Sequence, residues 1–233
     1  MFKSRAEEPA VKDRWSEGVA NEIEFWGQVI SGTGPNGHYH SDILSRLDPR
    51  AQVQAYLAPH LPTDRPARVL DIASGPVTNL GWMHGDVPMD VVAVDALADP
   101  YNALLDQHGF NPPARTRAGD GETIGEMFDE GTFDAVHIRN GLDHCYEPLR
   151  VLENALKVVR SGGVVMVVGF LNEAEFESYI GLHQWNVDVD GVDIVVWRPG
   201  ERHSVQQAFE GRAKVSATAY PDRRYMTAVI KKL

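Results

Sequence analysis

The sequence predicts an α/β protein with a doubly wound, mostly parallel sheet, and two observations support that prediction. Apolar runs and helical patterns alternate from position 68 onward, which is the order that a doubly wound sheet requires. The apolar runs are short and nearly continuous, as in parallel strands that helices cover on both faces. The first run, at 69–72, is followed at once by small residues, which is typical of a strand that turns sharply into a helix.

Strands and helices are expected to alternate through the middle of the chain. We predict strands over 68–73, 90–95, 114–118, 133–138 and 163–170, with helices over 76–84, 99–108, 121–129 and 146–160. A further helix is expected over 172–181. The apolar runs at 191–198 and 224–231 are predicted to be the last two strands, which close one edge of a seven-stranded sheet. The polar stretch 199–223 has no assigned element.

The residues before this pattern are expected to form a helical cap or substrate lid at 1–62, in front of a main domain at 63–233. Apolar residues recur every three or four positions through 1–30, which predicts an amphipathic helix. They are Trp15, Val19, Ile23, Trp26 and Ile30. This helix could pack its aromatic stripe on the main domain, or bring Trp26 into a substrate pocket, and the two roles are compatible.

A loop and two short helices are expected between that helix and the first strand. The stretch 31–40 is rich in Gly and Pro, which favours a loop or hinge. Ser41 is expected to cap one short helix, and a second is expected from 48 to about 59. His40, at the histidine-rich end of the loop, is a candidate for substrate contact. Two nearby histidines without a third ligand are a weak metal signal, so no metal site is assigned.

Length, charge and cysteine content limit the class of protein. The chain has 233 residues, enough for one large domain with a sizeable core. No stretch approaches the ~20 apolar residues of a membrane span, and the first residues lack the apolar segment of a signal peptide. Cys145 is the single cysteine, which excludes an internal disulfide and a cysteine-based zinc cluster. We therefore expect a cytoplasmic protein that does not bind membranes.

The net charge of −11 argues against a general nucleic-acid binder. Neutralising phosphates requires clustered Lys and Arg, and the basic residues here are scattered. A small-molecule substrate is the expected partner. The oligomeric state is not predicted.

Small residues and two acids at strand ends predict a ligand with an adenosine moiety. Asp71 ends the first strand, where open α/β sheets bind their ligands. The side chains of Ala73, Ser74 and Gly75 are small or missing, so a ligand can approach the backbone closely. Asp95 ends the second apolar run, where an acid can accept two hydrogen bonds from a ribose diol.

Five motifs in this order and spacing resemble the class I S-adenosylmethionine-dependent methyltransferases over roughly residues 66–171. They are V-L-D-I-A-S-G-P at 69–76, V-V-A-V-D at 91–95, A-G-D-G-E at 118–122, F-D-A-V-H-I-R-N-G-L-D-H at 133–144, and L-R-V-L-E-N-A-L-K-V-V-R followed by S-G-G-V-V-M-V at 149–167. The resemblance implies a Rossmann-like, seven-stranded, mostly parallel sheet with one terminal antiparallel strand. It also implies S-adenosylmethionine as the cofactor.

The resemblance implies roles for the matching positions. The methionine half of the cofactor would lie among Asp71, Ala73 and Gly75, the ribose at Asp95, and the adenine at Asp120 and Gly121, while Ile138, Arg139 and Asn140 would lie along the cofactor. One departure is that Ala73, Gly75 and Val77 stand where the family often has three glycines. A sulfonium cofactor needs no phosphate cradle, so this weaker glycine pattern favours S-adenosylmethionine over a dinucleotide.

Two groups of residues are candidates for handling the acceptor. Asp143 and His144 follow the fourth strand, where an acceptor would meet the cofactor. We expect His144 to be a general base or to orient the substrate, with Asp143 as its partner or a second contact. A capping pair that anchors the loop is the alternative. His183 and Trp185 are candidates for recognising a polar ring, and the alternative is a core tryptophan beside a satisfied histidine.

The expected function is methyl transfer to a small molecule, with oxygen as the expected nucleophile, although nitrogen, carbon, protein or RNA acceptors remain open. The rival enzyme is a nicotinamide-dependent oxidoreductase, for which Ala73-Ser74-Gly75-Pro76 is a poor match to the G-x-G-x-x-G loop. A cofactor-binding domain that regulates a partner without catalysis is the rival from another class.

Overall fold

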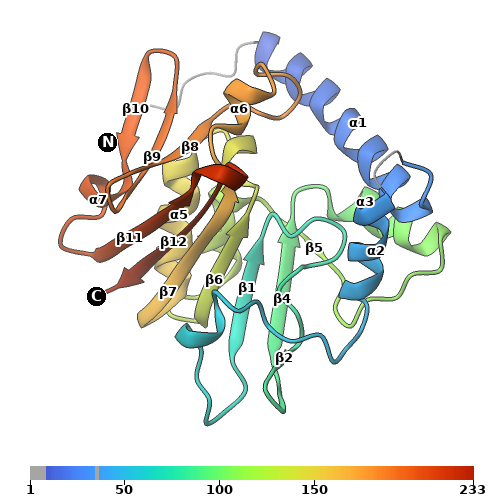
Figure 1. Cartoon of the computed structure of the whole chain (residues 1–233), viewed down its shortest axis with the longest axis horizontal. Coiled ribbons are helices and arrows are strands. Elements are labelled where there is room, and N and C mark those ends of the chain that lie inside the picture. Colours follow the sequence, from blue (N-terminus) through green and yellow to red (C-terminus); the bar gives the residue numbers. More distant parts are fainter. Residues whose placement is uncertain (1–8, 35–36) are drawn as a thin grey trace.

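The computed structural model describes residues 9–34 and 37–233 and contains one large twisted sheet with helices on both faces (Figure 1). Its strands are β1 (Arg68–Ile72), β4 (Asp90–Asp95), β5 (Arg117–Ala118), β6 (Phe133–Arg139), β7 (Val159–Phe170), β11 (Ala213–Tyr220) and β12 (Tyr225–Lys232). They lie in the order β11-β12-β7-β6-β1-β4-β5. Strand β12 is antiparallel to β7 and β11, and the other pairs are parallel. The predicted seven-stranded, mostly parallel sheet is confirmed.

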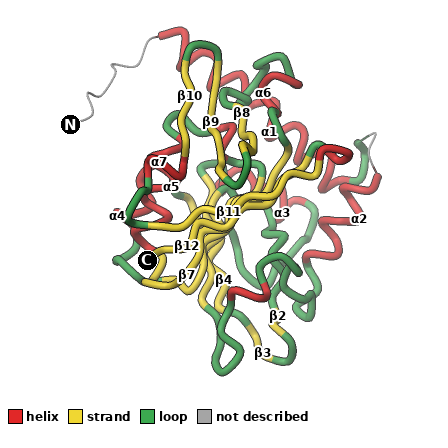
Figure 2. Tube along the Cα trace, turned by 60° about the vertical axis from the view of Figure 1, so that its left-hand side comes forward, coloured by secondary structure: helices red, strands yellow, loops and turns green. Residues whose placement is uncertain are grey.

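Alternate side chains of the central strands enter two cores, one on each face of the sheet. Leu70 and Ile72 of β1 join the core that includes helix α5 (Pro148–Val158), whereas Val69 joins the core that includes the N-terminal helices. Figure 2 shows the sheet nearly edge on, with helices on its two sides. Burial on both faces explains why these strands are nearly continuous apolar runs.

Two helices and a long connection make up the described N-terminal part. They are α1 (Pro9–Ser31), α2 (Gly37–Arg46) and the 3-10 turn η1 (Ala58–His60). The amphipathic helix predicted over 1–30 is confirmed from Pro9 onward as α1, and the first eight residues of that prediction lie outside the described part of the chain. The predicted cap at Ser41 is wrong, because α2 begins at Gly37 and Ser41 lies inside it. The ring Nδ1 of His40 lies 2.8 Å from the Val29 carbonyl oxygen, which ties this first turn to α1.

The helices predicted over 48–59 and 76–84 are wrong, and one set of contacts explains both. These two segments bond to each other through their backbones: Val53 N–H donates to Met83 O (2.7 Å) and Gln54 N–H to Leu80 O (3.0 Å). A helix in either segment would use those groups internally. Instead, 76–82 forms turns and leads into the hairpin of β2 (Met83–His84) and β3 (Val87–Pro88). Gly81 takes φ +85, and an added Cβ there would lie 2.2 Å from Gln52 O.

The remaining central elements agree with the prediction in kind and differ in length. Helix α3 (Ala98–Gln107) and α5 are close to their predicted spans, while β7 begins four residues before its predicted start at 163. The strand expected over 114–118 is reduced to β5. The helix expected over 121–129 is the 3-10 turn η2 (Gly121–Thr123) followed by α4 (Ile124–Met127). A further 3-10 turn, η3 (Leu142–His144), follows β6.

The C-terminal part differs most from the prediction. A small antiparallel sheet contains β8 (Asn186–Asp190), β9 (Asp193–Arg198) and β10 (Glu201–Ser204), followed by α7 (Val205–Ala208). The run at 191–198 therefore does not close the main sheet, where β11, from the unassigned stretch, takes the edge. The turn η4 (Pro221–Arg223) joins β11 to β12, which confirms the predicted strand at 224–231.

The helix expected over 172–181 is shorter than predicted. It is α6 (Glu173–Phe176), and the chain leaves the helical conformation soon after it. Ser178 and Tyr179 take φ +54 and +56, in the left-handed region that helices do not use. Among the described residues, no helix is long and apolar enough to cross a membrane.

Candidate active site

A cavity of about 620 Å³ lies at the carboxyl ends of the parallel strands and is lined by residues from the N-terminal helices, the strand ends and α6. It contains all ten residues predicted to bind a cofactor, namely Asp71, Ala73, Ser74, Gly75, Asp95, Asp120, Gly121, Ile138, Arg139 and Asn140. It also contains Asp143, His144, Trp26 and His183. Residues predicted separately from distant parts of the sequence thus share one cavity.

The turn after β1 is held in a conformation that favours small residues. Ala73 takes φ +55 and Gly75 φ +65. A Cβ added to Gly75 would lie 3.3 Å from Cζ2 of Trp26, so α1 covers this turn closely. The hydroxyl of Ser74 lies 3.3 Å from that of Thr116, a residue just before β5. The small side chains here leave the backbone open toward the cavity.

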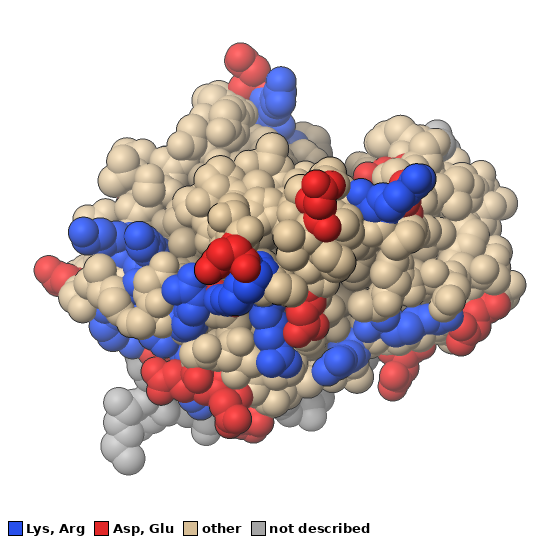
Figure 3. Space-filling view, turned by 90° about the horizontal axis from the view of Figure 1, so that it is seen from below, with Lys and Arg blue, Asp and Glu red and all other residues tan. Residues whose placement is uncertain are grey.

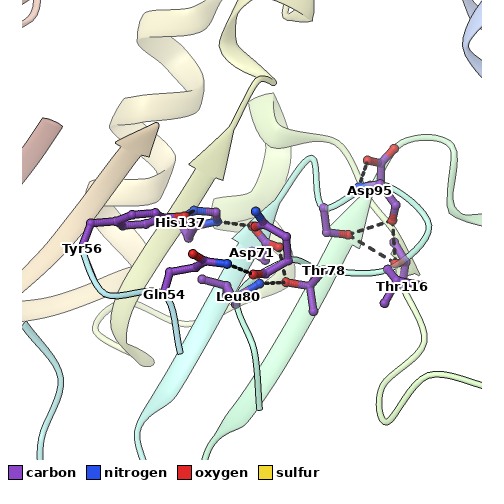
Figure 4. A network of polar contacts seen from close by, with 12 residues as sticks. Gln54, Tyr56, Asp71, Thr78, Leu80, Asp95, Thr116 and His137 are labelled. Carbon is purple, nitrogen blue, oxygen red and sulfur yellow. Dashed lines mark hydrogen bonds and ion pairs between the residues drawn. The ribbon is translucent and has the colours of Figure 1, made fainter. Parts of the chain in front are cut away.

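Asp71 lies at the floor of the cavity and is almost completely buried. Its Oδ1 accepts a hydrogen bond from His137 Nδ1 (2.7 Å), and its Oδ2 accepts one from the Thr78 hydroxyl (2.5 Å) (Figure 4). On the far side of the imidazole, the Tyr56 hydroxyl lies 3.0 Å from His137 Nε2. Within residues 9–34 and 37–233, the donors to this carboxylate are therefore side chains.

Asp95 ends β4 and is held by main-chain groups instead. Its Oδ2 accepts from Gly75 N–H (2.9 Å) and its Oδ1 from Leu97 N–H (2.8 Å). Burial raises the pKa of Asp95, while these two hydrogen bonds act in the opposite direction. Each carboxylate oxygen has a second lone pair and can still accept from a ligand hydroxyl.

Asp120 and Glu122 form a pair of carboxyl groups beside the predicted adenine position. Asp120 Oδ1 accepts from Glu122 N–H (2.9 Å), and Glu122 Oε1 accepts from the N–H groups of Tyr146 (2.8 Å) and Glu147 (3.2 Å). Burial, with Asp120 close by, raises the pKa of Glu122 to about 8. At Gly121 an added Cβ would lie 3.1 Å from Val151, so helix α5 packs directly behind this turn.

The residues after β6 form the wall between the two ends of the cavity. Asn140 takes φ +50, and its Oδ1 accepts from Phe170 N–H (3.2 Å), which ties the ends of β6 and β7 together. Arg139 and Arg46 are the two arginines among the described lining residues, against nine carboxyl side chains. The cavity therefore favours a ligand that carries positive charge.

Asp143, His144 and His183 form a cluster at the other end of the cavity. His183 Nδ1 donates to Asp143 Oδ2 at 2.7 Å, whereas His144 Nε2 lies 3.3 Å from the same oxygen. The two imidazole rings are 4.7 Å apart between centroids and nearly perpendicular. Burial disfavours the charged form of His183, but the hydrogen bond and charge of Asp143 prevail and raise the pKa of His183.

Main-chain contacts hold the two segments of this cluster together. The Asp143 carbonyl oxygen accepts from Gln184 N–H (2.8 Å) and Trp185 N–H (3.1 Å), and Gln184 Nε2 donates to His144 O (3.2 Å). One nitrogen or oxygen atom from each cluster residue lies within 4.8 Å of the others, which is close enough to share a metal ion after small side-chain movements. The His183–Asp143 hydrogen bond already satisfies two of these groups.

A comparison with known protein families identifies the domain that contains the cavity. Residues 70–167, which run from β1 into β7, match the family model described as a methyltransferase domain. Residues 70–167 therefore form a methyltransferase domain, as expected from the resemblance to the class I S-adenosylmethionine-dependent enzymes.

One curated relative matches a similar part of the chain. The demethylmenaquinone methyltransferase of Renibacterium salmoninarum is 34% identical over 103 residues, which make up 44% of this chain and 41% of that protein. The matches to this chain span 41% and 53% of the lengths of two curated relatives.

Solved structures share the fold at low sequence identity. A Burkholderia thailandensis 1,6-didemethyltoxoflavin-N1-methyltransferase, crystallised with S-adenosylhomocysteine, is 17% identical, with a TM-score of 0.50 over 99% of this chain and 93% of that one. A Haemonchus contortus phosphoethanolamine N-methyltransferase, also with S-adenosylhomocysteine, is 12% identical, with a TM-score of 0.59 over 94% of this chain and 60% of that one. These likenesses concern the fold.

Three of the predicted substrate residues occupy different places relative to the cavity. Trp26 lines the cavity, and its Nε1 donates to Glu22 Oε1 (2.9 Å). His40 packs against α1 and is outside the described lining of the cavity. Trp185 is also outside that lining. It is 3% exposed, and Arg198 lies over its ring at 4.0 Å, so it belongs to the core, which was the alternative to substrate contact.

The sequence prediction missed several polar residues of the site. Tyr56, Thr78 and His137 hold Asp71, and Glu122 lies beside Asp120. His137 had a usable signal: it is a polar residue inside an apolar strand, and β6 pairs with β1 so that His137 faces Asp71. Tyr56 had no such signal, because it lies in a connection whose path depends on tertiary contacts.

Proposed function

We propose that this protein transfers the methyl group of S-adenosylmethionine to an oxygen atom of a small-molecule acceptor. The observation that carries this proposal is that one cavity contains both the strand-end carboxylates and the Asp143–His144–His183 cluster. The carboxylates suit a cationic cofactor with a ribose, and the cluster suits an acceptor that must lose a proton. Neither feature alone would indicate both partners of the reaction.

The residues present at the cofactor end fit S-adenosylmethionine. Asp95 would accept from the ribose hydroxyls, Asp120 and Gly121 would contact the adenine, and Asp71 would face the ammonium group directly or through water. The turn at 73–75 is free of large side chains where the methionine half would lie. When bound, the cofactor supplies an electrophilic methyl group on a positively charged sulfur. The excess of carboxyl groups in the cavity stabilises that charge.

The cluster would prepare the acceptor. Methyl transfer is an in-line displacement, so holding the acceptor oxygen in line with the methyl group supplies much of the rate acceleration. A hydroxyl becomes a good nucleophile when a base removes its proton. His183 is better placed for this role than His144, because its hydrogen bond to Asp143 is shorter, at 2.7 Å against 3.3 Å. We assign His183 as the base, Asp143 as its partner and His144 as an orienting group.

Aromatic side chains in the cavity wall suit an acceptor with an aromatic or other apolar body, such as a phenol. Phe25, Tyr39 and Phe170 line the cavity and remain partly exposed, at 39%, 36% and 37%. Phe25 and Tyr39 pack edge to face, with centroids 5.8 Å apart. Exposed aromatic side chains grouped at a cavity are typical of sites that bind flat ligands. A sugar hydroxyl is the second candidate of the same reaction class.

We further propose that the protein is cytoplasmic and does not bind nucleic acids. On the face shown in Figure 3, Lys and Arg lie beside Asp and Glu and form no large basic field. Phosphate backbones are bound by such fields. The single cysteine supports a cytoplasmic location, because no internal disulfide can form.

The direct test is transfer of a labelled methyl group from S-adenosylmethionine to matched panels of phenols, sugar alcohols and amines. We expect transfer to hydroxyl acceptors, a loss of at least about 100-fold in turnover in His183→Ala, and unchanged S-adenosylhomocysteine affinity. Treatment with a chelator should leave the rate unchanged, since the imidazole acts as the base. Transfer to amines alone, at the same rate in His183→Ala, would refute the oxygen assignment.

A further inference from the structure

The carboxylates at the cofactor end are held in two different ways. Asp95 and Asp120 accept hydrogen bonds from main-chain N–H groups of their own or neighbouring turns. Asp71 is 2% exposed, and the donors to its carboxylate are the side chains of His137 and Thr78. Main-chain donors come with the fold, whereas side-chain donors depend on particular residues.

The position of His137 follows from the register of the sheet. Asp71 in β1 pairs directly with His137 in the adjacent parallel strand β6. Both side chains point to the face covered by the N-terminal part of the chain, and His137 is 0% exposed. A histidine buried without hydrogen bonds on both ring nitrogens would be costly. The register therefore places an imidazole against the carboxylate, and a second partner is needed on its other nitrogen.

Tyr56 supplies that second partner. Its hydroxyl lies 3.0 Å from His137 Nε2, and the two rings are stacked, with an interplanar angle of 11°. Burial raises the pKa of Tyr56, so the hydroxyl keeps its proton and can donate it. Figure 4 shows Tyr56, His137 and Asp71 in one row across the sheet.

The chemistry of the three groups fixes the direction of the hydrogen bonds. An ionised carboxylate can only accept, so Nδ1 of His137 must carry the proton that it shares with Asp71. In a neutral ring Nε2 is then the acceptor, and Tyr56 donates to it. Both donors therefore point toward Asp71, so the buried carboxylate keeps its hydrogen-bond partner in a fixed position.

We propose that His137 and Tyr56 are positioning residues that hold the Asp71 carboxylate in the orientation that suits the amino-acid end of the cofactor. This inference rests on the proposed function, because it needs S-adenosylmethionine as the ligand. Tyr56 lies in the connection from α2 to η1. The N-terminal part of the chain therefore contributes to the cofactor site twice, through Tyr56 beside His137 and through Trp26 over Gly75. Loss of either residue would weaken cofactor binding and leave acceptor binding almost unchanged.

Three variants test this role by calorimetry with S-adenosylhomocysteine. His137→Leu removes both hydrogen bonds, His137→Asn keeps a donor near the position of Nδ1, and Tyr56→Phe removes only the outer hydroxyl. We expect about a tenfold or greater loss of affinity in His137→Leu, substantial rescue in His137→Asn, and a smaller loss in Tyr56→Phe. Tyr220→Phe, which removes an exposed hydroxyl on β11, is the matched control and should bind normally.

A nitrogen NMR spectrum of the ligand-free protein shows which ring nitrogen of His137 carries the proton. This measurement needs neither enzyme activity nor a ligand. We expect the proton of the neutral His137 ring on Nδ1, with Nε2 unprotonated, and a change in the Nε2 signal in Tyr56→Phe. A proton on Nε2 alone would overturn the inference. So would normal cofactor affinity in a folded His137→Leu variant, or equal losses in His137→Leu and His137→Asn. A wild-type protein that binds no S-adenosylhomocysteine would instead refute the proposed function itself.

Discussion

The two ends of the cavity are assembled in different ways. At the cofactor end, Asp95 and Asp120 bond to N–H groups within their own turns or from the neighbouring strand end. At the acceptor end, Asp143 after β6 meets His183, forty residues later in the chain. The contacts of Asp95 and Asp120 therefore follow from the sheet, whereas the acceptor end needs a distant segment to return to it.

The largest expected effect is the loss of turnover in a variant of the acceptor end. Asp143→Asn should lower turnover by about 100- to 10,000-fold, because it removes the charge that holds and polarises the base His183. Affinity for S-adenosylhomocysteine should stay within about twofold, since the cofactor end is untouched. Asp190→Asn, in an exposed ion pair of the small sheet, is the control. Equal losses of turnover and cofactor affinity in Asp143→Asn would mean that the two ends do not act separately.

The complementary change acts on the cofactor end. Asp95→Ala should lower the affinity for S-adenosylhomocysteine by about 10- to 100-fold, because hydrogen bonds to a charged group are worth roughly 1.5–3 kcal/mol. At saturating cofactor, the affinity for the acceptor should change little. Equilibrium binding measures the affinity for S-adenosylhomocysteine, and KM for the acceptor at saturating cofactor checks the acceptor site. A variant that binds the cofactor normally would contradict the assignment of Asp95 to the ribose.

Gly75→Ala tests the close cover of the turn by Trp26. Both Gly75 (φ +65) and Gly85 (φ +62) take left-handed conformations, but only at Gly75 would an added Cβ meet a neighbour within 4 Å. We expect each alanine variant to lose about 1 kcal/mol of stability. Only Gly75→Ala should also weaken cofactor binding. Similar cofactor affinities in both variants would show that Trp26 does not restrict the turn.

The smallest expected effect is on the pH dependence of stability. Because the folded-state pKa of Glu122 is raised to about 8 from the usual 4.5, folding favours its protonated form. The native state then binds more protons than the unfolded state between about pH 4.5 and 8, so this group lowers stability as the pH rises through that range. Glu122→Gln should flatten part of this decline in thermal unfolding curves. A steeper decline in the variant would contradict the shift.

Much of the fold and the cofactor end could be predicted from the sequence because the signals there are local. The apolar runs of β1, β4, β6 and β7 are buried on both faces. Asp71 and Asp95 lie at the carboxyl ends of β1 and β4, and Asp120 lies directly before the turn η2. Each strand or turn is indicated by residues within it or a few positions away, because hydrophobic periodicity and turn-forming residues act over short stretches of sequence.

The rest could not be predicted because it depends on contacts between distant segments. The stretch 76–84 has helix-compatible residues, but its backbone bonds to 51–54 and it forms turns. The strand β11 reads as polar because its side chains are alternately exposed at the sheet edge. The Asp143–His183 pair and the Tyr56–His137–Asp71 network likewise need the tertiary fold before their members meet.

The most direct test of the account is calorimetry of the wild-type protein, Asp95→Ala and Asp143→Asn with S-adenosylhomocysteine, with NAD as the control ligand. We predict micromolar binding to the wild type and to Asp143→Asn, a clear loss in Asp95→Ala, and no binding of NAD. Binding of NAD in preference, or no binding of S-adenosylhomocysteine to the wild type, would contradict the assignment of this cavity to methyl transfer.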